Sequence, residues 1–168
     1  MYGLCLEVDR SRLSLLGFSG GDAVALCVAS QDKRVASIAA CACPAEFTFF
    51  TDGGEAQSII DHFRRMGLIR DKAFPASAAE WLNGFRELSP IKYVDRIAPR
   101  PLLLVHGSRD KVVVMAHAHR LYAKAGEPRE IIIVEGAEHR LRQDDRAMEA
   151  VINWLKSRLT CTKQKGYN

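Results

Sequence analysis

Long apolar runs are missing from this sequence of 168 residues, and so is the charged-then-apolar start of a secretory signal. A membrane span would need roughly 18 consecutive apolar residues, which no stretch provides. The basic residues are scattered, the net charge is only +4, and no recognition motif accompanies them. These absences argue against membrane insertion and nucleic-acid binding, and they predict a soluble, cytoplasmic protein.

The sequence also lacks the cysteine pattern of a disulfide-stapled protein, because its five cysteines are an odd number at irregular spacing. They are Cys5, Cys27, Cys41, Cys43 and Cys161. Reduced thiols are therefore expected. Cys41 and Cys43 lie two residues apart on an expected strand, but no second Cys or His pair has metal-site spacing. Neither a G-x-G-x-x-G segment nor a phosphate-binding loop is present, so no metal and no cofactor are expected.

What the sequence does contain is an alternation of apolar strands and amphipathic helices, with 48% hydrophobic and 26% charged residues overall. The length fits one domain, which we place at residues 1–160, followed by a basic tail at 161–168. The expected strands are Leu13–Phe18, Val35–Ala42, Pro101–His106 and Glu130–Val134, and the expected helices are Asp22–Ser30, Val114–Ala125 and Asp144–Leu159. This pattern predicts an α/β fold, a parallel sheet with helices on both faces.

One segment, at about 47–95, interrupts the alternation with two helix-like stretches, Glu55–Met66 and Ala78–Leu88. An insertion of this length between two strands is more often functional than a bare connection. Following the carboxyl end of a strand, it is expected to form a small helical lid. Its aromatic and large apolar side chains would either line a pocket or pack the lid internally; they are Phe47, Phe49, Phe50, Phe63, Met66, Phe74, Trp81 and Phe85.

The strongest motif lies near the start of the chain, where Gly17-Phe18-Ser19-Gly20-Gly21 matches G-x-S-x-G. A strand precedes it and a helix follows, which is the context of a nucleophile elbow. Such a sharp turn strains the serine backbone and demands small neighbours, and it projects the hydroxyl from the top of the sheet. Ser19 is therefore the predicted nucleophile, and the Gly20 N–H is a predicted oxyanion-hole donor.

A serine nucleophile needs a base and an orienting carboxylate, and the sequence offers both at strand ends. Asp110 follows the third expected strand and His139 follows the fourth, each on a glycine-containing loop. Because the carboxyl ends of parallel strands open on one side, the three side chains are expected to converge. The chain order Ser, Asp, His is that of nucleophile-elbow hydrolases.

Other histidines and acids are weaker candidates. His106 ends a strand and is expected to be a packed residue, whereas His62 is expected to face solvent or contact substrate. His117 and His119 lie two apart on a helix and point in different directions. Among the acids, Glu135 and Glu138 are too close in sequence to His139 to reach its far nitrogen, and Asp95 lies at the wrong end of a strand.

The segments GFSGGDAVAL, RPLLLVHGSRDKVV and IIVEGAEHRLR together resemble an α/β-hydrolase of the esterase and prolyl-oligopeptidase-like type. The resemblance covers Leu13 to Leu159 and corresponds to the C-terminal half of that fold, from the nucleophile elbow onward. It implies Ser19 as nucleophile, His139 as general base and acid, and Asp110 as orienting carboxylate. No cofactor is implied, because such a triad needs none.

The departure from that family concerns the strands expected before the elbow, since about four strands are visible where the family usually has eight. The second oxyanion-hole donor, supplied by the loop after the third family strand, is expected to be missing from this chain. Losing one such donor typically costs about 100- to 1000-fold in rate. The open edge of the strand Leu13–Phe18 is expected to be covered, either by Met1–Val8 or by a second copy in a homodimer.

Two functional hypotheses follow from these residues. The first is a serine hydrolase that cleaves an ester, a thioester or a small amide of a small-molecule acyl substrate through an acyl-enzyme. The second is a truncated, catalytically weak or inert hydrolase-like domain that serves as a binding or assembly module. Covalent labelling of Ser19 by a fluorophosphonate separates the two.

Overall fold

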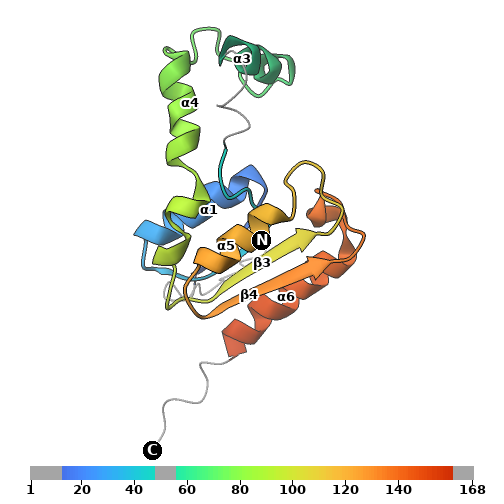
Figure 1. Ribbon diagram of the computed structural model, residues 1–168. Coiled ribbons are helices and arrows are strands. Elements are labelled where there is room, and N and C mark those ends of the chain that lie inside the picture. Colours follow the sequence, from blue (N-terminus) through green and yellow to red (C-terminus); the bar gives the residue numbers. More distant parts are fainter. Residues whose placement is uncertain (1–12, 48–55, 161–168) are drawn as a thin grey trace, which may run out of the picture.

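The four expected strands form one parallel sheet in the computed structural model, which describes residues 13–47 and 56–160. The strands are β1 (Leu13–Phe18), β2 (Val35–Cys41), β3 (Leu102–Gly107) and β4 (Arg129–Val134), in the order β1-β2-β3-β4. All three neighbouring pairs are parallel. Their carboxyl ends therefore meet at one edge of the sheet, as the sequence predicted, and the arrows of β3 and β4 point the same way in Figure 1.

Helices cover both faces of this sheet. On one face α1 (Gly20–Gln31) and α5 (Ala116–Lys124) pack against it through a core that includes Leu26 and Leu121. On the other face α6 (Asp145–Thr160) packs through Ala147, Val151 and Trp154. The spacing of four and three residues places those side chains on one stripe of α6. Two separate cores thus hold the sheet between helical layers.

Burial distinguishes the central strands from the edges. Every residue of β3 is buried, and β2 is buried except at Ala36, which explains their nearly continuous apolar sequences. In β1, by contrast, the side chains of Leu13 and Leu16 are each 38% exposed. β1 has no strand neighbour on its outer side among the described residues.

The observed boundaries differ from the expected ones by one or two residues. Helix α1 begins at Gly20 rather than Asp22, because the first helical residues need no intrahelical partner for their N–H groups. Strand β3 begins at Leu102 rather than Pro101, in keeping with proline's lack of a ladder N–H. The Pro101 carbonyl still accepts a hydrogen bond from Ile38.

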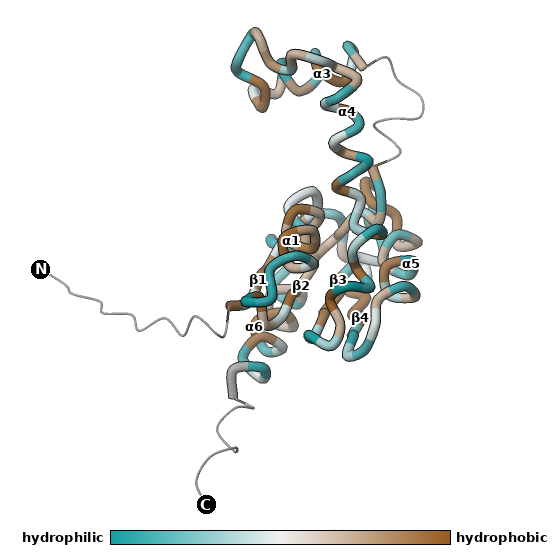
Figure 2. The backbone as a smooth tube through the Cα atoms, turned by 90° about the vertical axis from the view of Figure 1, so that its left-hand side faces the viewer, coloured by the Kyte–Doolittle hydropathy of each residue, from teal (hydrophilic) through white to brown (hydrophobic). Residues whose placement is uncertain are grey.

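Between β2 and β3 the chain forms a helical lobe, by which we mean α3 (Ala56–Arg65), α4 (Ala78–Glu87) and their connection. The lobe stands apart from the sheet (Figure 1), and hydrophobic and hydrophilic residues alternate along it, whereas hydrophobic residues dominate β1, β2 and α1 (Figure 2). Trp81 holds the lobe together through edge-on contacts with Phe63, Phe74 and Phe85, at ring-centroid distances of 5.6, 6.3 and 5.1 Å. The 3-10 turns Pro90–Lys92 and Val94–Arg96 then lead back to β3. The two expected helices are confirmed.

Helix α5 anchors the segment that leaves β2 toward the lobe. The N–H of Ala45 donates to Nδ1 of His117 at 3.1 Å, and Arg120 pairs with Glu46 at 2.5 Å. Burial, together with the charge of Arg120, lowers the pKa of His117, which keeps its ring nitrogen available as an acceptor. The root of the lobe is therefore fixed to the body of the molecule.

The remaining sequence predictions concern thiols and membrane segments. Cys27, Cys41 and Cys43 carry free thiols. Burial raises the pKa of Cys41 to about 12, and it also raises the pKa of Cys43 well above its usual range. In 13–47 and 56–160, no helix is long and apolar enough to cross a membrane. Cys5, Cys161, the Met1–Val8 segment and the basic tail lie outside the described residues.

Candidate active site

Ser19 occupies a strained turn between β1 and α1. Its backbone has φ 54° and ψ −124°, a conformation that non-glycine residues rarely adopt. The Ser19 N–H donates to the Cys41 carbonyl at 2.9 Å, so the end of β2 holds the turn in place. The strand-turn-helix context expected of a nucleophile elbow is present.

The glycines of the motif differ in what they do. A Cβ on Gly17 would lie 2.2 Å from Oδ1 and 2.8 Å from the Cα of Asp22, so the first turn of α1 leaves no room there. A Cβ on Gly20 or Gly21 would meet nothing within 4 Å among the described residues. The structure thus requires a small residue at Gly17, as expected, but leaves room for a larger side chain at Gly20 and Gly21.

Close contact between two loops brings Asp110 and His139 together. A Cβ on Gly107 would lie 2.3 Å from the Ala137 carbonyl oxygen, so only glycine permits this approach. Arg109 N–H donates to the same carbonyl at 2.9 Å, and Gly136 N–H donates to Ser108 Oγ at 2.8 Å. The loops after β3 and β4 are therefore bonded to each other at several points.

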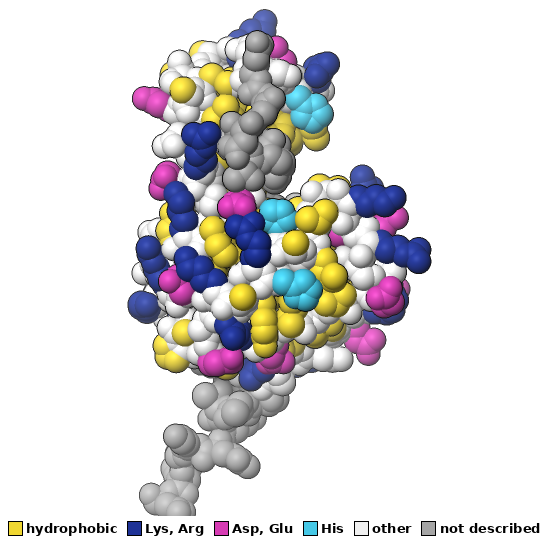
Figure 3. All heavy atoms as spheres, viewed as in Figure 1, with side chains coloured by type: hydrophobic (Ala, Val, Ile, Leu, Met, Phe, Trp, Pro, Cys, Tyr) yellow, Lys and Arg dark blue, Asp and Glu magenta, His cyan; other side chains and the backbone are white. Residues whose placement is uncertain are grey.

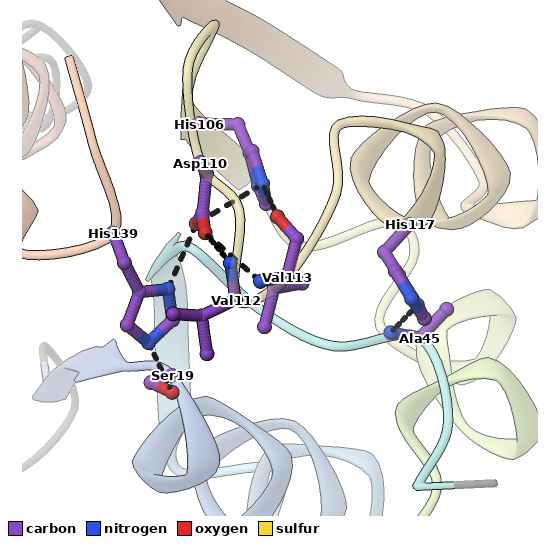
Figure 4. A network of polar contacts seen from close by, with 8 residues as sticks. All are labelled: Ser19, Ala45, His106, Asp110, Val112, Val113, His117 and His139. Atoms are coloured by element: carbon purple, nitrogen blue, oxygen red, sulfur yellow. Dashed lines mark hydrogen bonds and ion pairs between the residues drawn. The ribbon is translucent and has the colours of Figure 1, made fainter. Parts of the chain in front are cut away.

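The three predicted residues form one continuous hydrogen-bonded chain (Figure 4). His139 Nδ1 lies 2.8 Å from Oδ2 of Asp110, and His139 Nε2 lies 2.9 Å from Oγ of Ser19. The other oxygen of Asp110 accepts the N–H groups of Val112 and Val113, both at 2.9 Å. Residues 120 positions apart in sequence thus meet at the carboxyl edge of the sheet.

Burial differs along this chain of contacts. The side chain of Asp110 is fully buried, that of His139 is 21% exposed, and Ser19 is half-buried. A buried carboxylate on Nδ1 fixes the imidazole with its Nε2 toward the hydroxyl, and that nitrogen can accept the hydroxyl proton. The arrangement has the geometry required for nucleophilic catalysis by a serine.

Gly20 begins α1, and its N–H is one of the helical donors with no intrahelical partner. It is exposed and lines the cavity beside Ser19. The role of this N–H as an oxyanion-hole donor stays a prediction, which the positive end of the helix dipole favours.

An apolar cavity of about 500 Å³ opens beside Ser19, between α1, the loop after β3 and the helical lobe. Its lining residues are Ser19, Gly20, Ala23, Val24, Pro44, Phe47, Phe63, Leu68, Phe85, Leu88, Val112 and Val113. Figure 3 shows the notch between the lobe and the body of the molecule. Of the aromatic set named from the sequence, Phe47, Phe63 and Phe85 line the cavity, whereas Phe74 and Trp81 pack within the lobe. Met66 is 57% exposed, and Phe49 and Phe50 lie outside the described residues.

A second cavity of about 720 Å³, with mostly polar lining side chains, borders His139. Val112, Glu138, His139, Arg140, Gln143 and Asp144 line it. Val112 borders both cavities, whereas Ser19 lines the apolar one and His139 lines this second one.

The other histidines lie elsewhere, with one exception. His62 and His119 are exposed, and His117 accepts the Ala45 N–H. His106 is 1% exposed and is packed, as expected, but its Nε2 also lies 3.5 Å from Oδ2 of Asp110. Sequence reasoning did not predict this contact, which the turn after β3 makes between residues four positions apart.

Asp22 is a buried acid that sequence reasoning missed. It is fully buried beneath the elbow, and neither carboxylate oxygen has a hydrogen-bond partner among the described residues. Burial raises its pKa well above the usual range, and the backbone at Cys41 and Ser19 offsets this only in part. No cluster of three potential metal ligands occurs in the part of the chain that the structure describes.

Comparison with known proteins decides the family. The model of the prolyl oligopeptidase family matches residues 6–161, which is nearly the whole sequence. This chain belongs to the prolyl oligopeptidase family. The resemblance inferred from the sequence motifs is thereby confirmed.

Among curated relatives, the uncharacterized protein YfhR of Escherichia coli K12 is 34% identical over 133 residues. That match covers 79% of this chain and 40% of YfhR. YfhR of Escherichia coli O157:H7 is 28% identical over 157 residues, covering 91% and 48% respectively. The chain thus spans about half, or less, of the length of these relatives.

Solved structures of hydrolases share the fold. The esterase domain of a Rhodothermus marinus protein aligns with a TM-score of 0.61 at 22% identity, over 86% of this chain and 60% of that domain. A puromycin hydrolase aligns with a TM-score of 0.66 at 23% identity, over 90% and 22%. The α/β hydrolase GrgF of Penicillium sp. sh18 gives 0.60 at 18%, over 90% and 64%. The described sheet is therefore a partial α/β-hydrolase fold.

Proposed function

We propose that this member of the prolyl oligopeptidase family is a serine hydrolase that cleaves carboxylic esters through an acyl-enzyme. The supporting observation is the continuous contact from Ser19 through His139 to Asp110, placed at the mouth of an apolar cavity. Ser19 is the nucleophile, His139 the general base and acid, and Asp110 the orienting carboxylate. Thioesters and small amides are further substrates of the same chemistry.

In the acylation step, Oγ of Ser19 attacks the carbonyl carbon while Nε2 of His139 takes the hydroxyl proton. The new carbon–oxygen bond turns the carbonyl oxygen into an oxyanion beside the Gly20 N–H. As the tetrahedral intermediate collapses, the bond to the alcohol oxygen breaks, and His139 returns its proton to that leaving oxygen. The alcohol departs and the acyl group remains on Ser19.

Deacylation repeats these steps with water as the nucleophile. His139 Nε2 takes a proton from water, and the hydroxyl oxygen bonds to the acyl carbon. The bond to Ser19 Oγ then breaks, and His139 protonates that oxygen. Ester and water are thereby converted to acid and alcohol with the enzyme restored, so Asp110 serves to hold the imidazolium and need not itself change protonation.

The two cavities, one lined by Ser19 and the other by His139, support an ester with an apolar acyl part. The space next to Ser19 is walled by Phe47, Phe63 and Phe85, which suit an aryl or medium-chain acyl group. The space beyond His139 is bordered by Glu138, Arg140 and Asp144, which suit a polar alcohol. A small-molecule acyl ester fits this division better than a uniformly polar substrate does.

A fluorophosphonate probe tests the nucleophile directly. Attack by Ser19 forms an oxygen–phosphorus bond, expels fluoride and passes the serine proton to His139. We expect labelling of the folded wild-type chain and its loss in Ser19→Ala and His139→Ala, while His62→Ala, a change at an exposed histidine, labels like wild type. Folded wild-type protein that stays unlabelled would instead support the inert binding or assembly module.

Substrate class is tested with a panel of p-nitrophenyl esters of increasing acyl length beside an amide substrate. We expect the highest kcat/KM for aryl or medium-chain esters. Puromycin is a useful amide because one structural neighbour is a puromycin hydrolase. Faster cleavage of puromycin than of every ester would replace the ester proposal with an amidase.

A further inference from the structure

His106 is a buried polar side chain that the proposed mechanism does not use. It lies near the end of β3, where every residue is buried, and is 1% exposed. A buried imidazole must find hydrogen-bond partners or lose free energy on folding. Where its ring nitrogen points therefore shows what the residue holds in place.

Its Nε2 lies 2.7 Å from the carbonyl oxygen of Val113. Because a carbonyl oxygen only accepts, Nε2 must carry the hydrogen, which fixes the ring's tautomer at this nitrogen. The same Nε2 lies 3.5 Å from Oδ2 of Asp110. One N–H group thus faces both the start and the end of the turn 110–113 (Figure 4).

The turn it spans carries two parts of the proposed site. Oδ2 of Asp110 is the oxygen that contacts His139 at 2.8 Å, and Oδ1 is held by the N–H groups of Val112 and Val113. Val113 also lines the apolar cavity beside Ser19. His106 therefore contacts both the orienting carboxylate of Asp110 and the backbone carbonyl of Val113, which lines the cavity.

We propose that His106 is a positioning residue that sets where Oδ2 of Asp110 meets His139 and where Val113 borders the acyl cavity. This inference rests on the proposed serine-hydrolase function for its kinetic consequence only. A displacement of about 1 Å in a catalytic group can cost 100-fold in rate. The contact of His106 with Oδ2 also couples the two histidines through a shared oxygen.

The coupling is measurable in the wild-type chain without any substrate. With ¹⁵N-labelled histidine, we expect the His106 Nε2–H resonance to shift as His139 is titrated. A proton gained by His139 strengthens its attraction to Oδ2 of Asp110 and so weakens the interaction of that oxygen with His106 Nε2–H. His117 on α5 is a further titratable group within electrostatic reach of His106 and Asp110. The shift should persist in His117→Gln and vanish in His139→Gln. A resonance that ignores the His139 titration, or that still shifts in His139→Gln, overturns the coupling.

Variants test the kinetic consequence. His106→Phe keeps a ring but removes the donor, and His106→Gln keeps an N–H donor at similar reach. We expect fluorophosphonate labelling to slow about 10- to 100-fold in the Phe variant, whereas the Gln variant stays close to wild type. Leu104→Val is the matched control, because Leu104 is a buried residue of the same strand that belongs to the core under α1 and α5.

The pH profile of labelling separates positioning from general destabilisation. With the His106 donor removed, more of the Asp110 charge acts on His139, so the acid limb of the profile should move to higher pH in His106→Phe. It should stay in place in Leu104→Val. If His106→Phe and Leu104→Val both fold and have the same labelling rates and pH profiles, the proposal is refuted. If His106→Phe does not fold, the test uses His106→Asn, whose amide is shorter. Equal labelling of wild type and folded His106→Asn then refutes the proposal. A wild-type chain that shows coupled resonances but no labelling would sink the hydrolase proposal and leave the His106 contact standing.

Discussion

Asp22 places an acid directly beneath the strained serine, in a space that also excludes any side chain on Gly17. A carboxyl group without hydrogen-bond partners is far better tolerated in its neutral form, because burial penalises the charge. Cys41 and Cys43 are its titratable neighbours, and the charge of Asp22 contributes to their own raised pKa values. The surroundings of Asp22, Cys41 and Cys43 beneath the elbow therefore favour the protonated form of all three side chains.

This raised pKa predicts a pH dependence of stability. The unfolded chain releases the Asp22 proton above about pH 3.9, while the folded chain retains it, so the free energy of unfolding falls as pH rises from there toward the folded-state pKa. Each pKa unit is worth about 1.4 kcal/mol, or roughly 3–5 °C in Tm for a chain of this size. In Asp22→Asn the corresponding part of the decline in Tm should disappear.

The measurement is the Tm difference between wild type and Asp22→Asn across the acidic-to-neutral range. His117, whose pKa is lowered in the fold, contributes with the opposite sign, since its protonation on acidification favours the unfolded chain. That contribution cancels in the difference. The exposed variant Asp95→Asn is the control and should run parallel to wild type. An Asp22→Asn curve parallel to wild type would refute the prediction.

Gly17 and Gly21 predict opposite outcomes within one motif. Gly17→Ala forces a Cβ against the carboxyl and backbone of Asp22 and should cost about 1–3 kcal/mol. Gly21→Ala places its Cβ in open space on the first turn of α1 and should be neutral or stabilising by up to about 1 kcal/mol. Thermal unfolding of both variants gives the comparison, and an equal loss in both would contradict it.

At this scale, chain position predicted which side chains would meet, and their catalytic roles stay a prediction. Ser19, Asp110 and His139 each follow a recognisable strand, so topology alone brings them to one edge, and the structure places them in contact. Asp22 and His106 could not be assigned in this way. Their surroundings depend on tertiary packing, Asp22 against Gly17 and His106 across a turn, which local patterns do not encode.

At the scale of elements, the two helices of the lobe were predicted from the sequence as two helix-like stretches. The sequence could not predict which aromatic side chains line the cavity and which only pack within the lobe, because aromatic residues suit both roles. The structure separates them: Phe85 lines the cavity, whereas Phe74 contacts Trp81 and is 44% exposed. The role of the lobe as a lid remains a proposal.

Phe85→Ala tests whether the lobe contributes to substrate binding. Removing this ring from the cavity wall should raise KM for apolar acyl esters, by about 10- to 200-fold if the loss is 1–3 kcal/mol. Phe74→Ala is the matched control, since it also removes an aromatic contact with Trp81 without opening the cavity. Steady-state kinetics on the same ester should distinguish the two, and an equal rise in KM would mean that the lobe acts only through its own packing.

At the scale of the whole molecule, the sheet edge at β1 carries Leu13 and Leu16, and the neighbouring α1 exposes Val24 and Val28. Exposed strand edges with apolar side chains favour association. Cover by a second copy stays a prediction from the sequence, and a twofold-symmetric pair through β1 would align the two strands antiparallel.

Size-exclusion chromatography with light scattering tests this association. We expect a mass twice that of the monomer for wild type and a monomer for Leu16→Lys, because a charge on an edge strand opposes pairing. Ser157→Lys, a change at an exposed position of α6, controls for added charge. A stable, non-aggregating wild-type monomer would contradict the dimer.

The contacts among the loops after β3 and β4 have a mechanical consequence. Gly107 and Arg109 join these loops through their backbone and Ser108 through its Oγ, whereas Ser19 contacts His139 through one hydrogen bond. His139 and Asp110 therefore lie on two loops that are bonded to each other, whereas Ser19 follows β1, on the other side of β2. A relative shift of β1 and β3 would therefore change the distance between Oγ and Nε2, across which the proton must travel.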